Sequence, residues 1–299
     1  MAATTTTVER TSEPPRLRVF ARIRELSSYR EILVNLVRKE LKVKYTASVL
    51  GAVWSLLNPV VFLAVFTFVS IVTHNQIANY PVYLLSGLLA WNMFSVAISV
   101  AARSVIDNSN LVKKVYFPRE ILPLSAIGVA LVDYALQSGV LLAFMLVTGY
   151  GFHPVNLLLF PLAFLTLLAF TTAVSFWLSA MNVRYRDIQH LLNLGLIVWF
   201  WMTPVVYATW LVQSTQKEIL GVNMFVVYLL NPLAPIVEGM HRALYSVVTP
   251  PGSEHAVLAA VSLRWIAGVL SIVLAASIGL LFLTWRTFFR LSGDFAEEL

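Results

Sequence analysis

The chain has 299 residues, of which 59% are hydrophobic and only 12% are charged, and its mean hydropathy is +0.78. A soluble domain carries roughly 25% charged residues, so this composition indicates an all-α integral membrane protein with room for about six spans and excludes a second large soluble domain. The absence of cysteine excludes disulfides and thiolate metal sites, and in a membrane protein the net charge of +6 reflects topology and contact with membrane lipids, with no nucleic acid as partner.

The N-terminal region divides into a tail and a basic helix. Residues 1–27 begin Thr-rich and include Pro14-Pro15, which predicts a disordered cytoplasmic tail, and the first apolar span starts too late for a cleavable signal. Ser28 with Glu31 fits a capping box that opens an amphipathic interface helix over 28–45. Two roles fit this helix: an anchor on anionic lipid, or a flank of the entrance for an anionic substrate.

Charge-free runs predict six transmembrane helices within residues 46–290, followed by a cytoplasmic tail at 291–299. We expect spans at about 50–73 and 82–102, two within 121–183 on either side of the break at Gly149–Pro154, one over 188–216 bent at Pro204, and one between Arg264 and Arg286.

The stretch 219–242 is ambiguous. Its apolar core, Met224–Leu230, is only seven residues long, which covers about a third of the hydrocarbon thickness. We therefore expect a dipping gate segment at about 215–250, built from one or two short re-entrant or interfacial helices before the last span.

The distribution of cations predicts the orientation. With both termini cytoplasmic, 18 of the 21 Lys and Arg residues lie in cytoplasmic segments of a multi-pass protein of the plasma (inner) membrane. The exceptions are Lys217, Arg242 and Arg264. A true span at 219–242 would export the basic residues after the last span, so the six-span topology is favoured.

Two predicted cytoplasmic connections carry unusual chemistry. The first begins with the helix-start signal Asp107-Asn108-Ser109 and continues as Asn110-Leu-Val-Lys-Lys-Val-Tyr-Phe-Pro-Arg-Glu120, with three cations around two aromatic residues and a proline. This run presents a stiff aromatic surface suited to a cytoplasmic partner, although its aromatic residues would also serve as interfacial anchors. The second connection, Arg184-Tyr-Arg-Asp187, is so tight that a push on it would move both flanking spans.

Three ordered runs stand out: Lys42-Val-Lys-Tyr-Thr-Ala-Ser-Val-Leu-Gly-Ala-Val-Trp-Ser-Leu-Leu-Asn-Pro59, Asn110 to Pro123, and Asn182-Val-Arg-Tyr-Arg-Asp-Ile188. These runs resemble the signatures of type-2 ATP-binding-cassette export permeases. Within that superfamily they are most similar to subunits that export O-antigen, teichoic acid and related lipid-linked polysaccharides, and the Ala- and Val-rich composition resembles the actinobacterial (mycobacterial-type) galactan exporters. The resemblance covers nearly all of the chain beyond residue 27.

The resemblance implies a homodimer of permeases around a central conduit, with two copies of a nucleotide-binding ATPase subunit docked beneath. ATP and Mg would be bound by the partner subunit, and this chain would hold no cofactor or metal and would be no enzyme by itself. The sequence agrees, since it contains no GxxxxGK[ST] phosphate loop. The residues expected to couple to the ATPase are Lys113, Lys114, Val115, Tyr116, Phe117, Arg119, Arg184, Tyr185, Arg186 and Asp187.

The implied substrate is an undecaprenyl- or decaprenyl-diphosphate-linked polysaccharide, and aromatic and basic residues predict its path. Sugar rings would stack on aromatic walls, although the same aromatics suit an interfacial belt, and Trp199 and Trp201 point to different sides of a helix, so at most one faces the conduit. The diphosphate would need cations at the cytoplasmic mouth. The conduit candidates are Trp54, Tyr83, Trp91, Trp199, Trp201, Tyr207 and Trp210, and the entrance candidates are Arg38, Lys42 and Lys44.

Ionisable groups within the apolar segments are scarce. Asp133 is the one acid inside a span, and because it is solitary in sequence we expect a structural, hydrogen-bonded or protonated carboxyl group rather than a functional one. In the dipping segment, Glu238 with His241 and Arg242 would latch an outer gate, or Glu238 would form a satisfied surface ion pair.

Other function classes make different demands on the sequence. The alternatives are an ion-coupled lipid-linked glycan flippase and an exporter of another amphipathic substrate. The flippase, like other secondary transporters, favours several intramembrane ionisable groups and internal repeats, whereas the sequence shows one acid and no repeat. A lipid-linked glycosyltransferase needs a cluster of acids or histidines, but the five histidines are scattered without ligand spacing. Dependence of transport on ATP and on a copurified partner would distinguish an ATP-driven exporter from the ion-coupled flippase. Product formation from a nucleotide sugar would establish the glycosyltransferase.

Overall fold

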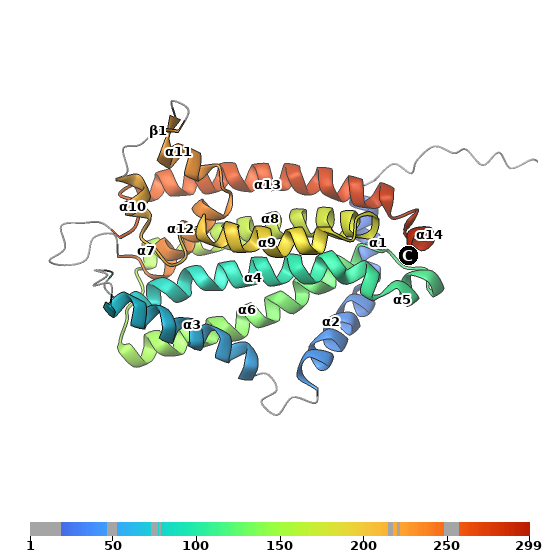
Figure 1. Ribbon diagram of the computed structural model, residues 1–299, viewed down its shortest axis with the longest axis horizontal. Helices are drawn as coiled ribbons and strands as arrows, with labels where there is room; N and C mark the ends of the chain where they lie inside the picture. Colours follow the sequence, from blue (N-terminus) through green and yellow to red (C-terminus); the bar gives the residue numbers. More distant parts are fainter. Residues whose placement is uncertain are drawn as a thin grey trace, which may run out of the picture.

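The described chain is a bundle of long helices that run side by side along one axis (Figure 1). The computed structural model describes residues 19–46, 53–72, 77, 79–214, 218–219, 222–247 and 257–299. Within these ranges, four helices are long and apolar enough to cross a membrane: α4 (Tyr80–Asp107), α6 (Ile121–Thr148), α8 (Leu159–Arg184) and α13 (Leu263–Leu291). The predicted all-helical membrane fold is confirmed.

Two shorter helices occupy the places of the remaining predicted spans. Helix α3 (Val53–Val72) includes an apolar stretch over Pro59–Val72, and α9 is Ile188–Trp201. The 14 residues of α9 extend about 21 Å, which is less than the roughly 30 Å of a hydrocarbon core. The count of six spans therefore stays a prediction.

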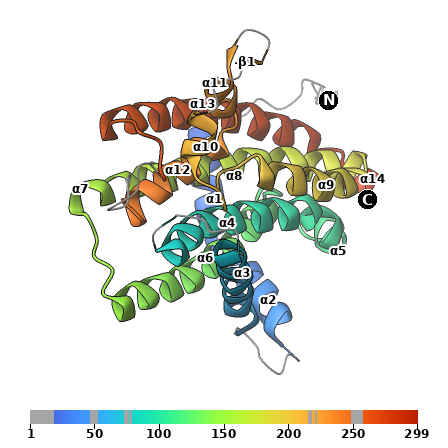
Figure 2. The same ribbon diagram turned by 60° about the vertical axis from the view of Figure 1, so that its left-hand side comes forward.

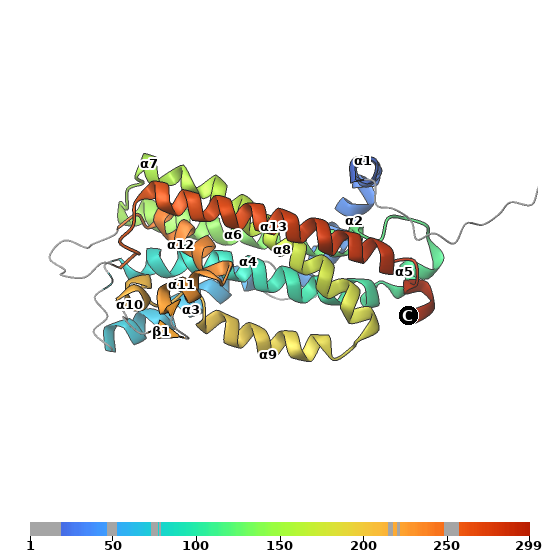
Figure 3. The same ribbon diagram turned by 90° about the horizontal axis from the view of Figure 1, so that it is seen from above.

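The connecting elements gather at two ends, which we call the basic end and the distal end (Figures 1 and 3). The basic end holds α1 (Val19–Ser28), the start of α2 (Arg30–Tyr45), α5 (Ser109–Lys114), the turn at 185–187 and α14 (Phe295–Glu298). The distal end holds α7 (Pro154–Leu157), α10 (Thr209–Gln213), the antiparallel pair β1 (Glu218–Ile219) and β2 (Val222–Asn223), α11 (Met224–Leu229) and α12 (Leu233–Leu244).

The arrangement around the bundle is asymmetric. Figure 2 shows α2 and α3 on one side of the long helices and α13 on the opposite side. Helix α8 makes its main contact with α13, and α4 packs against both α6 and α8. In Figure 3, α9 lies along the edge of the bundle, where it contacts α4 and α8 and buries none of its residues fully.

Buried apolar side chains form two clusters. The larger one joins α4, α6, α8, α12 and α13 through the middle and the distal end. The smaller one, the basic-end core, ties together segments that are far apart in the sequence. It consists of Leu36, Val105, Val112, Phe117, Ile121, Leu122, Phe176, Ala180, Val183, Trp285, Phe288 and Phe295.

The helix breaks follow the backbone chemistry of the sequence. Helix α6 ends at Gly149, whose φ of 67° lies in the left-handed region that glycine tolerates, and Pro154 opens α7. The predicted break between the third and fourth apolar helices is thus observed. The short helices predicted before the last span are also present, as α11 and α12.

The helix predicted over 188–216 is wrong beyond Trp201. Pro204 lacks a backbone N–H and disfavours helical backbone at Thr203, so the chain leaves the helix instead of bending within it. Asn231 stabilises this end, because its Nδ2 donates to the Met202 carbonyl at 3.1 Å and to Thr203 Oγ1 at 3.1 Å. The chain then turns into α10.

The N-terminal expectations need two corrections. Residues 19–27 belong to α1 rather than to a disordered tail, because tertiary contacts hold this short helix, and residues 1–18 lie outside the described ranges. The capping box is wrong as well. Ser28 ends α1, and its Oγ donates to the Glu25 carbonyl at 2.7 Å, while α2 starts after Tyr29.

Helix α2 packs along α6 rather than lying free on a surface. A Cβ on Gly128 would lie 2.7 Å from Val37 Cγ2, so any larger residue at this position would have to displace Val37. The amphipathic stripe read from the sequence therefore faces a neighbouring helix, and the opposite side of α2 stays exposed.

Candidate functional site

The first predicted coupling connection splits into an exposed part and a buried part. Lys113, Lys114 and Val115 are exposed, and Tyr116 is 89% exposed at the basic end. Phe117, in contrast, is only 5% exposed, because it belongs to the basic-end core. The ring of Phe117 is therefore not exposed beside Tyr116 but anchors the connection from beneath, and the coupling role of Phe117 stays a prediction.

Arg119 lies half-buried between these parts. Burial lowers the pKa of Arg119 despite the charge of Glu120 beside it. An arginine has so high an intrinsic pKa that it remains charged. Arg119 can therefore still present a cation beside Tyr116.

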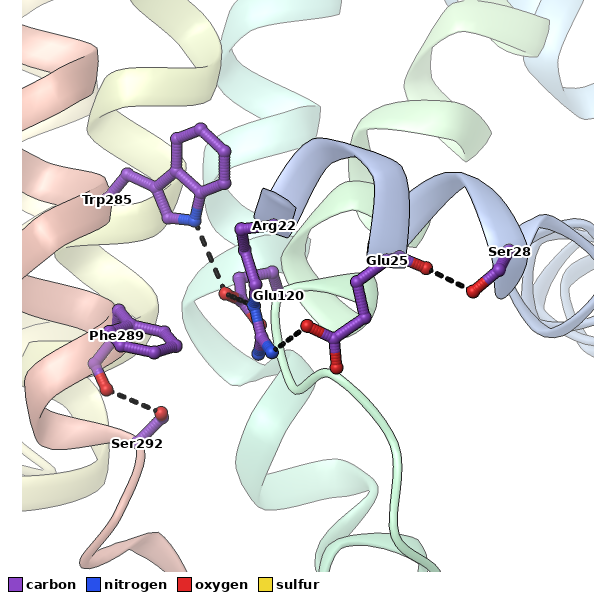
Figure 4. A network of polar contacts seen from close by, with 7 residues as sticks. All are labelled: Arg22, Glu25, Ser28, Glu120, Trp285, Phe289 and Ser292. Atoms are coloured by element: carbon purple, nitrogen blue, oxygen red, sulfur yellow. Dashed lines mark hydrogen bonds and ion pairs between the residues drawn. The ribbon is translucent and has the colours of Figure 1, made fainter. Parts of the chain in front are cut away.

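Glu120, the next residue, is fully buried, and the sequence pattern predicts no role for it. Figure 4 shows the polar contacts around it. Its carboxylate accepts hydrogen bonds from Arg22 Nε at 2.8 Å and from Arg22 Nη2 at 2.7 Å, and from Trp285 Nε1 at 3.3 Å. Three segments therefore meet at one carboxylate: α1, the first connection and α13. The sequence does hold a signal for this contact. Glu120 directly precedes a long apolar run, and an acid at such a position needs a cation near the start of the helix.

Arg22 is held from several directions. Its Nη1 donates to Glu25 at 2.7 Å, and its guanidinium lies 4.9 Å from the centre of the Phe289 ring. Burial by itself lowers the pKa of Arg22, but the hydrogen bonds and charges of Glu120 and Glu25 outweigh it and raise the pKa above its usual value. The Arg22–Glu120 contact is thus a bidentate ion pair.

The second predicted coupling turn is bound by acidic residues near the C-terminus of the same chain. Arg184 forms ion pairs with Asp294 at 3.4 Å and with Glu298 at 3.1 Å, whereas Tyr185, Arg186 and Asp187 are exposed. These acids belong to the segment predicted as a tail at 291–299, where α14 contacts both α5 and α8.

Phe295 of α14 is fully buried against Phe288, with ring centres 5.4 Å apart. The C-terminal helix therefore connects the two predicted coupling connections to each other.

The predicted entrance cations separate onto different faces of α2. Lys44 Nζ forms an ion pair with Asp133 Oδ2 at 2.6 Å, and the Tyr45 hydroxyl donates to Asp133 Oδ1 at 2.9 Å. Arg38 and Lys42 are exposed and, one turn apart, share the face turned away from α6. Asp133 is therefore not solitary, because its cation comes from a helix 89 residues earlier in the chain.

The aromatic conduit candidates gather around two cavities that flank α9. One, of about 890 Å³, is lined by Trp199, Trp201 and Tyr207 together with Tyr228 and Asn231. The other, of about 520 Å³, lies between α3, α4 and α9, and its lining includes Trp91 and again Trp201. Both volumes fall in the range of about 300–1,000 Å³ of small-molecule sites.

Trp199 and Trp201 differ in their surroundings, as their sequence spacing indicates. Trp199 Nε1 donates to Asn231 Oδ1 at 2.7 Å, and its ring packs against Phe94 and Phe170. Trp201 is 59% exposed. Trp201 thus has the more accessible face of the two.

The other conduit candidates are more buried or lie elsewhere. Tyr83 is fully buried and donates to the Tyr207 carbonyl, so its ring lines neither cavity. Trp91 is almost fully buried and touches the smaller cavity with its remaining edge. Trp210 is half-buried on α10, and the side chain of Trp54 lies outside the described residues.

The three predicted gate residues lie on α12, which is buried along its whole length. Glu238 Oε1 accepts from the Ala259 N–H at 2.9 Å and Oε2 accepts from Thr209 Oγ1, while Arg242 Nη2 donates to the Val261 carbonyl at 3.1 Å. The surface ion pair considered for Glu238 is therefore wrong.

His241 stacks on Tyr83 with ring centres 4.1 Å apart, and a Cβ on Gly87 would lie 2.4 Å from its Nε2. Glu238 and Arg242 thus fasten α10 and the segment before α13 to α12, and His241 packs α12 against α4.

The long apolar helices of the described residues are those of a multi-pass membrane protein. The chain matches the family "ABC-2 type transporter" over residues 32–245, and it belongs to that family. It is 35% identical, over 251 residues, to the O-antigen export system permease protein RfbA of Myxococcus xanthus, covering 82% of this chain and 93% of that protein. Two proteins of the same name from Klebsiella pneumoniae are each 32% identical over 196 residues, covering 64% of this chain and 75% of theirs.

Proposed function

We propose that this chain is the permease subunit of an ATP-driven exporter that moves a polysaccharide linked to an undecaprenyl or decaprenyl diphosphate, of O-antigen or galactan type, out of the cytoplasm across the inner membrane. Two copies of the permease would pair, and two copies of a separate ATPase subunit, which binds ATP and Mg, would drive them. The names of the relatives support the polysaccharide as substrate class.

The observation that carries the proposal is the pair of cavities that share Trp201 on α9. Aromatic rings contact the apolar C–H faces of sugars without requiring buried charge, which suits a long, uncharged polymer that must slide. Helix α9 lies at the edge of the bundle (Figure 3). A second copy brought against this edge would therefore enclose the cavities between two chains.

Residues at the basic end provide evidence for a partner subunit that drives transport. Tyr116 and the exposed residues Lys113 and Lys114 form one contact surface, and Tyr185 with Arg186 forms a second. The basic-end core and α14 join the two surfaces, so a partner that pushes on either one would move several long helices together.

The cations of α2 support an entrance for the diphosphate. Arg38 and Lys42 lie together on its exposed face, whereas Lys44 is engaged with Asp133. We therefore assign the diphosphate contact to Arg38 and Lys42. The same ion pair accounts for Asp133 without a proton relay, which disfavours the ion-coupled flippase.

Reconstitution in liposomes tests this proposal. The permease with its ATPase subunit should export lipid-linked polysaccharide only when ATP and Mg²⁺ are supplied, and collapsing the proton gradient should leave the rate unchanged. Export that runs on a proton gradient without ATP would establish the ion-coupled alternative instead. Export of a lipid without glycan at the same rate would contradict the polysaccharide assignment.

A further inference from the structure

Two carboxylates fasten the N-terminal helices to α6. Glu120, at the start of α6, binds Arg22 of α1, and Asp133, 13 residues later, binds Lys44 at the end of α2. The two points are about 20 Å apart along a helix with a rise of 1.5 Å per residue. Between them, Val37 contacts α6 at Gly128. Helices α1 and α2 therefore form a strap attached along α6 at three positions.

Of the three attachments, the one at Glu120 places the strictest requirements on the charge and the geometry of its partner. Its carboxylate is fully buried, and an unpaired charge in that position would be strongly unfavourable. Bidentate pairing fixes the direction of the guanidinium as well as its distance. Trp285 Nε1 satisfies the same oxygen that accepts from Arg22 Nε, so the last long helix shares this point (Figure 4).

The position of Glu120 links the strap to the proposed ATPase contact. Only three residues lie between Tyr116 and Glu120, and one of them, Phe117, is locked in the basic-end core. A displacement of the connection at the exposed Tyr116 must therefore also move Glu120, and Arg22 moves with Glu120 because the two side chains are paired. Since Tyr29 alone separates α1 from α2, a movement of α1 reaches the exposed cations of α2.

We infer that the Arg22–Glu120 pair is a positioning contact that transmits the movement of the first coupling connection to the α1–α2 strap, so that ATP hydrolysis repositions Arg38 and Lys42 at the substrate entrance. The inference rests on the proposed function. A purely structural pair would stabilise the protein without changing how much glycan is exported for each ATP hydrolysed.

The test uses the reconstituted permease–ATPase complex with Glu120→Gln, Arg22→Lys and the double variant Arg22→Gln/Glu120→Gln. Glu120→Gln keeps the size of the side chain and one acceptor oxygen but removes the charge, and Arg22→Lys keeps a charge but loses the bidentate geometry. Arg24→Gln is the matched control, because Arg24 is exposed on the same helix. We expect glycan exported per ATP to fall about tenfold in the first three variants and to stay unchanged in the control.

A second measurement follows α1 directly. The chain has no cysteine, so Phe20→Cys, at a position 90% exposed on α1, can carry a single nitroxide label. The label should change its mobility between the nucleotide-free and the ATP-bound complex, and Glu120→Gln should abolish the change. If Glu120→Gln does not fold, Arg22→Lys replaces it in both measurements.

The outcomes separate the inference from the function on which it rests. An unchanged export per ATP in the pair variants, or a label that does not respond to ATP in a complex that exports normally, would overturn the inference alone. An unaltered complex that hydrolyses ATP but exports nothing would overturn the proposed function, and the inference would fall with it.

Discussion

Lys44 and Asp133 form an ion pair of 2.6 Å between the end of α2 and the first half of α6. The 28 residues of α6 extend about 42 Å, and Asp133 lies about 18 Å from its first residue, in the half nearer the basic end. The Lys44 side chain is 40% exposed whereas that of Asp133 is 8% exposed. The lysine thus brings a charge from outside the bundle to a carboxylate within it.

Asp133→Asn should therefore do more than a substitution at an isolated structural acid. It removes a charged hydrogen-bond acceptor from Lys44 and weakens the docking of α2 on α6. We expect a loss of about 1–2 kcal/mol in the free energy of unfolding, discounted for the exposure of the lysine. Denaturation of the purified protein in detergent measures it.

The double variant Lys44→Gln/Asp133→Asn should cost less than the sum of the two single variants, because neither charge then remains without its partner. Lys42→Gln, at an exposed position on the same helix, is the control. Additive losses in the double variant would show that the pair makes no direct contribution.

Neighbouring aromatic residues in the first connection should respond in opposite ways. Tyr116→Ala removes an exposed ring, so folding should be unchanged, while ATPase stimulation and export should drop. Phe117→Ala opens a cavity in the basic-end core and should lower the free energy of unfolding by about 3–5 kcal/mol. Thermal denaturation and export assays on both variants check this contrast. A stable Phe117→Ala protein with impaired ATPase binding would instead assign Phe117 to the contact surface.

Cations on the two faces of α2 should also separate in function. Arg38→Gln with Lys42→Gln should weaken capture of the lipid diphosphate by more than about tenfold, since each exposed charge contributes about 1 kcal/mol near a membrane surface. Lys44→Gln should lower stability more than capture. Binding of a fluorescent lipid diphosphate to the variants in nanodiscs distinguishes them. Equal losses of binding in both variants would place Lys44 in the entrance as well.

Trp201→Ala should slow export with little effect on folding, because its ring is mostly exposed and borders both cavities. Trp199→Ala should destabilise the protein, since its indole binds Asn231 and packs against Phe94 and Phe170. Export rates normalised to the amount of folded protein measure the difference. Normal export by Trp201→Ala would remove this residue from the conduit.

Local chemistry was sufficient to predict most of the helices. Gly149 and Pro154 determine the break after α6 through backbone preferences that depend only on residue type, so the break can be predicted from the sequence. Pro204 was correctly identified as a disturbance, but whether a proline bends or ends a helix depends on what receives the freed backbone groups. Here the receiver is Asn231, which lies 29 residues away from Met202.

Contacts between residues that are distant in the sequence could not be predicted from it. Asp133 looked solitary because Lys44 is distant in sequence, and Glu120 received no role because Arg22 lies in a segment predicted to be disordered. Phe117 was placed on the surface with Tyr116 since both belong to one aromatic run. Which neighbour turns inward depends on the core formed by Phe176, Trp285 and Phe288.

Depletion of this protein in its own cell tests the central claim most directly. The account predicts that mass spectrometry will find a polyprenyl-diphosphate-linked polysaccharide accumulating in the cytoplasmic leaflet, and that the native chain restores its export. If no lipid-linked glycan accumulates while the protein is absent, this chain does not export a polysaccharide.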